Sequence, residues 1–219
     1  MLFKDRREAG QYLAQSLEEF ANRNDVVILA LPRGGVPVAY EVATTLNVPM
    51  DIFIVRKLGV PGQEELAMGA IASGGVRVLN EDVIQQFQVS DTSIAAVAAQ
   101  EERELERRER LYRKDLEALK VQSKSVILID DGLATGATMR AAALALRSLQ
   151  AKEVIVAVPV GAESTCDEFR SYVDRIVCGK TPEPFFGVGY WYENFSQTTD
   201  EEVMELLEKF VHEKPTAHR

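Results

Sequence analysis

The amino-acid sequence predicts a three-layer α/β domain built on a mostly parallel sheet. Short continuous apolar runs, such as VVILAL (26–31) and EVIVAVPV (153–160), are typical of strands that are buried on both faces. Segments with helical periodicity separate these runs, and strands that alternate with helices form parallel sheets through right-handed crossovers. The 219 residues can bury a substantial core, so we expect one domain over 1–219 with its core at about 26–178.

The individual elements follow from apolar spacing and from the positions of Gly and Pro. We predict helices over 4–24, 36–47, 91–120, 137–150 and 163–172. We predict strands over 26–31, 51–56, 126–130, 153–160 and 174–178, and a hairpin of 67–73 with 76–79 joined at Gly74-Gly75.

A helical insertion is expected at about 80–120, and its second half is dense in charge. Three Glu–Arg pairs there have the favourable i, i+4 order: Glu104 with Arg108, Glu106 with Arg110, and Glu109 with Arg113. This pattern favours a solvated helix packed along one edge, with a partner surface, such as that of a homodimer, as the alternative.

Composition excludes several classes of function. A formal net charge of −9 disfavours nucleic acid as a partner. The sequence has no run of 18 apolar residues, so we expect no membrane span. Only two histidines occur, both in the last eight residues, which removes most histidine-based catalytic and zinc sites. We expect Cys166 and Cys178 to be small buried side chains without a disulfide, in a reducing, cytoplasmic compartment.

The segment VILIDDGLATGAT (126–138) carries the chemistry. An apolar strand ends on Asp130 and Asp131, and a loop of small residues leads into a helix. A helix N-terminus binds phosphate well, whereas two carboxylates would repel phosphate and suit the hydroxyls of a sugar diol. The segment therefore predicts a sugar phosphate as ligand, with a plain strand-turn-helix as the alternative.

This segment resembles the motif with which type I phosphoribosyltransferases bind 5-phosphoribosyl-1-pyrophosphate (PRPP). The resemblance implies that Asp130 and Asp131 bind the ribose hydroxyls and stabilise the charge that develops in the reaction. It assigns the 5-phosphate to Ala134, Thr135, Gly136, Ala137 and Thr138. It assigns the pyrophosphate to Arg33, Gly34 and Gly35, where relatives often have a cis or strained peptide, and to Lys57.

The implied reaction is displacement of pyrophosphate from C1 of PRPP by a nitrogenous base or a related acceptor. Mg²⁺ would be carried by PRPP, without direct protein ligands. A lid is expected at 58–75, although this stretch has no Lys, Arg or His, and an aromatic hood at about 180–199 would receive the acceptor. The specific base is not identified, and a PRPP- or nucleotide-sensing regulator without catalytic activity is the alternative function.

Overall fold

A five-stranded sheet forms the centre of the computed structural model, which describes residues 2–114, 118 and 120–213. The sheet has the order β2-β1-β6-β7-β8, and every neighbouring pair is parallel. Its strands are β1 (Val26–Ala30), β2 (Met50–Ile52), β6 (Ser125–Ile129), β7 (Glu153–Val160) and β8 (Arg175–Lys180). The predicted α/β class with a mostly parallel sheet is confirmed.

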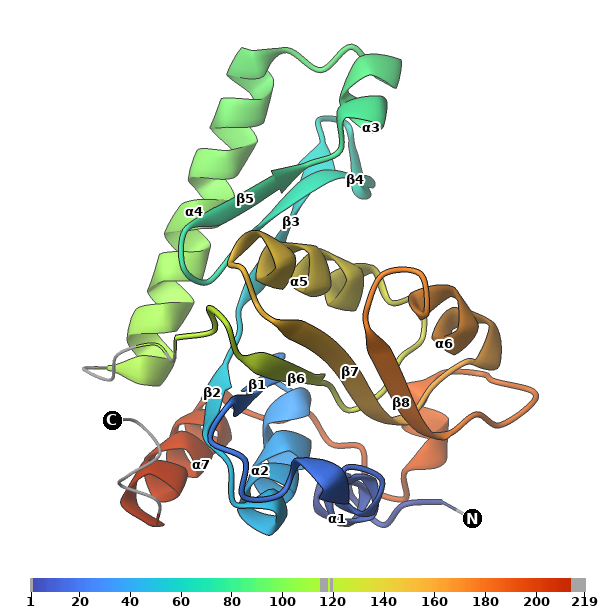
Figure 1. Cartoon of the computed structure of the whole chain (residues 1–219). Helices are drawn as coiled ribbons and strands as arrows, with labels where there is room; N and C mark the ends of the chain where they lie inside the picture. The colour runs from blue at the N-terminus through green and yellow to red at the C-terminus, as the bar shows by residue number, and fades with distance from the viewer. Residues whose placement is uncertain (1, 115–117, 119, 214–219) are drawn as a thin grey trace.

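Helices cover both faces of this sheet (Figure 1). The helices on one face are α1 (Arg6–Gln15), α2 (Gly35–Leu46) and α7 (Asp200–Glu213), and those on the other are α5 (Ala137–Ser148) and α6 (Glu163–Phe169). Strand β1 supplies Ile28 to the core on the α2 side and Leu29 to the core on the α5 side, as alternation along a strand requires. Two apolar cores thus enclose the sheet and produce the three layers.

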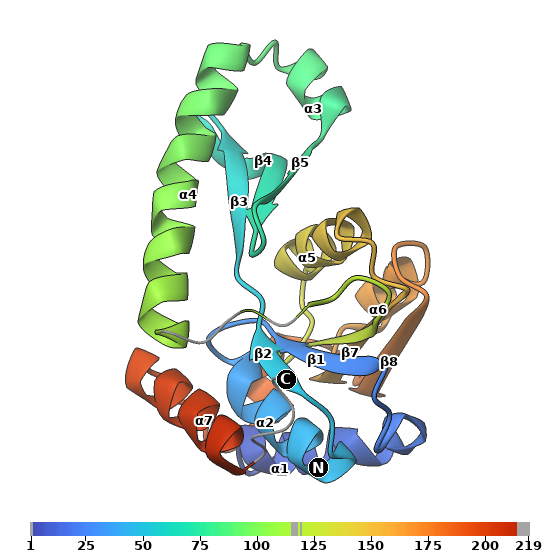
Figure 2. The same ribbon diagram turned by 60° about the vertical axis from the view of Figure 1, so that its left-hand side comes forward.

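A second, antiparallel sheet rises away from the first and packs along a long helix (Figure 2). It consists of β3 (Val55–Val60), β4 (Gln63–Ala72) and β5 (Val76–Leu79), in the order β3-β4-β5. The helices α3 (Glu81–Gln86) and α4 (Asp91–Arg113) follow. The predicted hairpin at Gly74-Gly75 is confirmed, and both glycines have positive φ angles.

The strand predicted over 51–56 is divided between the two sheets. β2 ends at Ile52, and the backbone of Ile54 exchanges hydrogen bonds with Ser73, whose Oγ accepts from the Ile54 amide at 3.0 Å. The Ser73 amide donates in turn to the Ile54 carbonyl at 2.9 Å. These contacts lead the chain out of the parallel sheet, so the prediction of one continuous strand is wrong.

Several helix boundaries also differ from prediction. α1 ends at Gln15 and a short 3-10 helix over Glu18–Phe20 follows, while α6 ends at Phe169. α3 lies within the expected helical insertion but was not predicted as a separate helix. Neither α7 nor the 3-10 helix over Val188–Trp191 was predicted. None of the described helices has the length and apolar character that crossing a bilayer requires.

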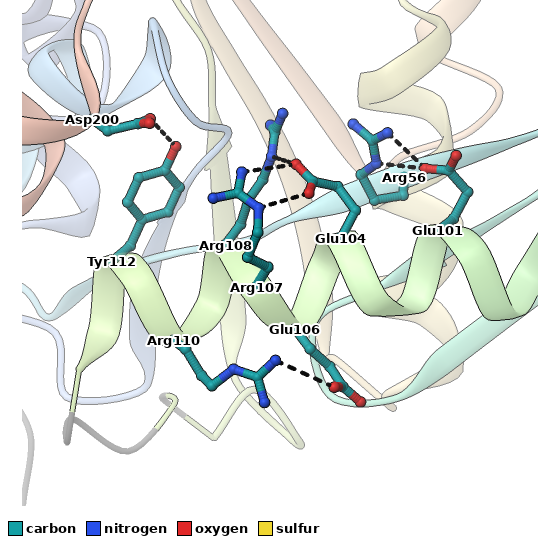
Figure 3. A network of polar contacts seen from close by, with 9 residues as sticks. All are labelled: Arg56, Glu101, Glu104, Glu106, Arg107, Arg108, Arg110, Tyr112 and Asp200. Atoms are coloured by element: carbon teal, nitrogen blue, oxygen red, sulfur yellow. Dashed lines mark hydrogen bonds and ion pairs between the residues drawn. The ribbon is translucent and has the colours of Figure 1, made fainter.

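Helix α4 ends at Arg113, and residues 115–117 and 119 of the predicted 91–120 helix lie outside the described part of the chain. The three predicted ion pairs are confirmed, at 2.8 Å for Glu104–Arg108, 3.8 Å for Glu106–Arg110 and 2.7 Å for Glu109–Arg113. Figure 3 shows the first two, which lie on different sides of α4.

The two cysteines form a disulfide between α6 and β8. The expectation that Cys166 and Cys178 lack a disulfide is therefore wrong. The turn after α6 leads back into β8, which brings Cys178 next to Cys166. The cysteines consequently give no support to a reducing compartment.

Candidate active site

The carboxyl ends of β1 and β6 lie side by side and present the two predicted loops to each other. Ala30 pairs with Ile129 in the parallel register, so Arg33-Gly34-Gly35 and Asp130-Asp131 follow at the same edge. The peptide bond between Pro32 and Arg33 is cis, as the resemblance led us to expect.

Both glycines of the first loop are required by close contacts with the two acids. A Cβ atom on Gly34 would lie 2.1 Å from Asp131 Oδ2. A Cβ atom on Gly35 would lie 2.6 Å from the Ile129 carbonyl oxygen and 2.9 Å from the Asp130 Cα. Any side chain at these positions would separate the loops, so the glycines hold the two parts of the site together.

The two carboxylates are half-buried next to each other, at an electrostatic cost. The Asp131 amide donates to Asp130 Oδ1 at 2.8 Å. Burial, and then the neighbouring Asp131, raise the pKa of Asp130 well above its usual range. Burial also raises the pKa of Asp131, although the Arg6 guanidinium opposes this shift. Adjacent, shifted carboxyl groups are typical of functional sites.

The loop after these acids leaves the N-terminus of α5 open. Gly136 precedes the helix with a φ of +71°, and no side chain caps the first amides. A Cβ atom at Gly136 would lie 2.4 Å from the Phe169 ring, so this position also requires glycine. Four of the five predicted phosphate-binding residues are exposed, namely Ala134, Thr135, Ala137 and Thr138. Exposed, uncapped amides at a helix N-terminus provide an anion site.

Arg33 lies in the first loop, where the sequence predicts it, and has an acidic neighbour. Its Nη1 is 3.6 Å from Asp200 Oδ1, at the start of α7. The Tyr112 hydroxyl of α4 donates to the same oxygen at 2.5 Å (Figure 3). Burial and this bond to Asp200 raise the pKa of Tyr112 to about 12. Three segments that are distant in sequence therefore meet beside the first loop.

Lys57 lies inside β3 of the antiparallel sheet, rather than at the end of a strand of the parallel sheet. The preceding Arg56 forms an ion pair with Glu101 of α4 at 2.6 Å (Figure 3). Because successive side chains of a strand point to opposite faces, Lys57 faces away from α4. Val55, on the same face as Lys57, packs into the core on the α5 side. Lys57 is thus directed toward the side of β3 on which α5 lies.

The stretch expected to form a lid is the β3–β4 ribbon with the turn that leads to β5. A pocket of about 560 Å³ separates part of this ribbon from α5. Thr135, Ala137 and Arg140 line one side of the pocket, and Leu66 and Gly69 belong to the opposite side. The pocket therefore opens next to the phosphate-binding loop.

Two contacts at the site were not predicted from the sequence, those that Arg6 and the hood residue Tyr192 make with Asp131. Arg6 Nε donates to Asp131 Oδ2 at 2.8 Å, and the Tyr192 hydroxyl donates to the Asp131 carbonyl at 2.6 Å. Arg6 belongs to the charged stretch KDRRE, which has the pattern of an ordinary solvated helix start, and nothing in it indicates a distant carboxylate.

The aromatic residues of the predicted hood divide into two groups. Tyr192 is buried and its ring lies 5.0 Å from that of Phe195. Phe186 and Tyr190 are each 70 % exposed, and their ring centroids are 5.9 Å apart. The second group leaves the larger exposed aromatic surface, since Phe195 is 37 % exposed.

The sheet, the paired acids and the open helix N-terminus have the arrangement of the α/β proteins that bind ligands at the carboxyl ends of their strands. A family model described as "Phosphoribosyl transferase domain" matches residues 4–193, and the chain belongs to this family.

Two relatives extend this assignment. A protein of Mycobacterium tuberculosis that carries the name "Putative phosphoribosyl transferase" is 45 % identical over 208 residues. That match covers 95 % of the present chain, which spans about half (47 %) of the relative. The crystal structure of TT1426 from Thermus thermophilus superposes with a TM-score of 0.86 at 36 % identity, covering 96 % of the present chain and 99 % of that one.

Proposed function

We propose that this protein is an enzyme that displaces pyrophosphate from PRPP with a nitrogenous base or a related acceptor. One observation carries the proposal. The half-buried Asp130-Asp131 pair lies between an open helix N-terminus on one side and the Arg33-Gly34-Gly35 loop on the other. A ligand with a phosphate, a diol and a pyrophosphate matches these three features in that order.

Each group of residues has a role that follows from its chemistry. The amides and hydroxyls of 134–138 bind the 5-phosphate, and the two carboxylates accept hydrogen bonds from the ribose hydroxyls. As the bond from C1 to pyrophosphate lengthens, the ribose becomes cationic and the carboxylates stabilise it electrostatically. Arg33 and the amides of Gly34 and Gly35 hold the departing pyrophosphate. The protein therefore acts by binding, orientation and electrostatics.

Mg²⁺ is part of the same proposal. Within the described ranges, no three His, Cys, Asp or Glu residues gather to hold a metal ion. Mg²⁺ would be carried by PRPP, with its ligands taken from the PRPP oxygens and from water and not directly from the protein. Bound there, Mg²⁺ would neutralise charge on the pyrophosphate.

The exposed pair Phe186 and Tyr190 is proposed to receive the acceptor. Two aromatic faces that are free of the core can stack on a planar base, with a gain of roughly 0.5–1.5 kcal/mol beyond the burial of area. A cytoplasmic location belongs to this proposal, because the reaction consumes two metabolites.

A regulator that senses PRPP or a nucleotide is the second candidate. The contact between Arg33 and Asp200 favours a regulator, because Asp200 pairs with the arginine that would have to bind the departing pyrophosphate. The ribbon also supplies no Lys, Arg or His between residues 58 and 75.

Release of pyrophosphate in the presence of PRPP, Mg²⁺ and a panel of purine and pyrimidine bases distinguishes the two functions. The enzyme releases pyrophosphate with at least one base, and the Asp130→Asn, Asp131→Asn double variant does not. Tight PRPP binding without release from any base would instead support the regulator.

A further inference from the structure

The N-terminal helix and the hood jointly hold one carboxylate of the proposed ribose site. Arg6 is the first residue of α1, which begins there because Asp5 accepts hydrogen bonds from the Arg7 and Glu8 amides. Its Nε donates to Asp131 Oδ2 at 2.8 Å, and its Nη1 donates to the Ser196 carbonyl at 2.7 Å. The guanidinium carbon lies 4.0 Å from the centre of the Phe195 ring.

These contacts leave the arginine little freedom. Its side chain is 11 % exposed and that of Asp131 is 15 % exposed. The guanidinium is held by a carboxylate from the strand end at Asp131, and by an aromatic face and a carbonyl from the adjacent residues Phe195 and Ser196. A surface arginine that only increases solubility would have none of these restraints.

The contact selects one oxygen of Asp131. Oδ2 faces both Arg6 and Gly34, since a Cβ atom on Gly34 would lie 2.1 Å from Oδ2 but 3.3 Å from Oδ1. Oδ1 is therefore the carboxylate oxygen that lies farther from Gly34 and that does not accept the Arg6 hydrogen bond. An oxygen in this position is suited to accept a hydrogen bond from a ribose hydroxyl.

The charges around Asp131 explain why this carboxylate needs a cationic partner. Asp130 adds a second carboxyl group from the same strand end, and Tyr192 contributes a neutral hydroxyl from the hood. Arg6 is the cation that counteracts burial at Asp131, where burial raises the pKa of the carboxyl group. Without Arg6, burial and the neighbouring acid would favour a protonated Asp131.

We infer that Arg6 is a positioning residue for the reaction, which holds Asp131 ionised and turned so that Oδ1 meets a ribose hydroxyl of PRPP. The inference rests on the proposed function and adds to it a residue from outside the strand-loop-helix segment. Arg6 itself acts through Asp131 and does not touch the substrate.

The test compares Arg6→Gln, Arg6→Lys and wild type in calorimetric titrations with PRPP and Mg²⁺, and with inorganic phosphate. We expect Arg6→Gln to weaken PRPP binding by about tenfold, the factor for loss of one hydrogen bond to a charged group. Inorganic phosphate has no diol, so its affinity should change by less than about twofold. Arg6→Lys retains the charge and should recover most of the PRPP affinity.

The pH dependence separates this role from a purely structural one. The ratio of wild-type to Arg6→Gln affinity should fall as the pH rises, because Asp131 ionises at higher pH even without its partner. Titration of PRPP itself cancels in the ratio. Arg7→Gln is the matched control, since it removes the same charge from an exposed neighbour and should bind like wild type.

Three results would overturn the inference while leaving the proposed function intact, provided that wild type binds PRPP. These are an unchanged PRPP affinity in Arg6→Gln, an equal loss of PRPP and inorganic phosphate, and a ratio that does not vary with pH. Should Arg6→Gln fail to fold, Phe195→Ala, which removes the ring that supports the guanidinium, must reproduce the pH-dependent loss. Failure of wild type to bind PRPP would count against the proposed function itself.

Discussion

Replacing Asp200 by Asn should strengthen PRPP binding, because the wild-type carboxylate competes with pyrophosphate for Arg33. The two side chains are 33 % and 36 % exposed and their closest atoms are 3.6 Å apart. An ion pair with this exposure is worth about 0.2–1 kcal/mol. Its removal should therefore raise PRPP affinity by about 1.5-fold to fivefold.

The substitution is conservative for the rest of the site. The Asn oxygen can still accept the hydrogen bond that Tyr112 donates to Asp200 in the wild type. Glu201→Gln is the matched control, since it removes a neighbouring acid from the first turn of α7. Both variants lose a similar favourable interaction with the helix dipole, about 0.3–1 kcal/mol of stability.

Calorimetric titration of wild type, Asp200→Asn and Glu201→Gln with PRPP and Mg²⁺ gives the three dissociation constants. A nucleoside monophosphate, which has no pyrophosphate, should bind all three proteins equally. Weaker PRPP binding in Asp200→Asn, or an equal gain in Glu201→Gln, would refute direct competition for Arg33.

Three further predictions concern the paired acids and the two loops. Asp130→Asn and Asp131→Asn should weaken PRPP far more than inorganic phosphate, whereas Thr138→Ala should weaken both by roughly 1 kcal/mol; equal losses in the Asp variants, measured by titration, would exclude the diol assignment. Arg33→Ala should weaken PRPP by about 1.5–3 kcal/mol and leave a nucleoside monophosphate nearly unaffected; a similar loss of the monophosphate would place Arg33 in the 5-phosphate site or the fold. The pKa of Asp130 is raised in the folded state, so between its unfolded and folded pKa the folded state binds more protons than the unfolded state. The stability of the wild type therefore falls as the pH rises through that interval. Asp130→Asn lacks this loss and should be more stable than wild type at pH 7 by about 0.5–2 kcal/mol, with a smaller difference at pH 4; urea unfolding that shows a less stable variant at pH 7 would contradict the shift.

The parallel sheet and the central motif were predictable because their signals are local. Apolar runs mark the buried strands, and in 126–138 the strand, the acids and the small-residue loop are contiguous. The register of β1 with β6 then brings Gly34 and Gly35 against the two acids. Sequence reasoning places these loops correctly because parallel strands end at a common edge.

The contacts that could not be predicted from the sequence join residues that are far apart in the chain. Arg6 meets Asp131 only because α1 packs beside the hood, and Asp200 meets Arg33 only because α7 returns to the first loop. The prediction of one strand over 51–56 is wrong for a similar reason, since the backbone of Ile54 forms its hydrogen bonds with Ser73. In each case the partner is a polar residue whose own surroundings in the sequence carry no signal.

Helix α7 shows a different limit. Its buried residues Val203, Leu206, Leu207 and Phe210 have helical spacing, so the sequence contained the evidence. The disulfide lacked such evidence, because two cysteines separated by 12 residues do not reveal whether a crossover brings them together.

Direct titration of the folded wild-type protein with PRPP and Mg²⁺ tests the central claim, that the carboxyl ends of β1 and β6 form a PRPP site. We predict saturable binding of one PRPP per chain, which is lost in the Asp130→Asn, Asp131→Asn double variant while the variant remains folded. The absence of binding of PRPP and of every nucleoside monophosphate tested, by wild-type protein with an intact cooperative unfolding transition, would contradict the account.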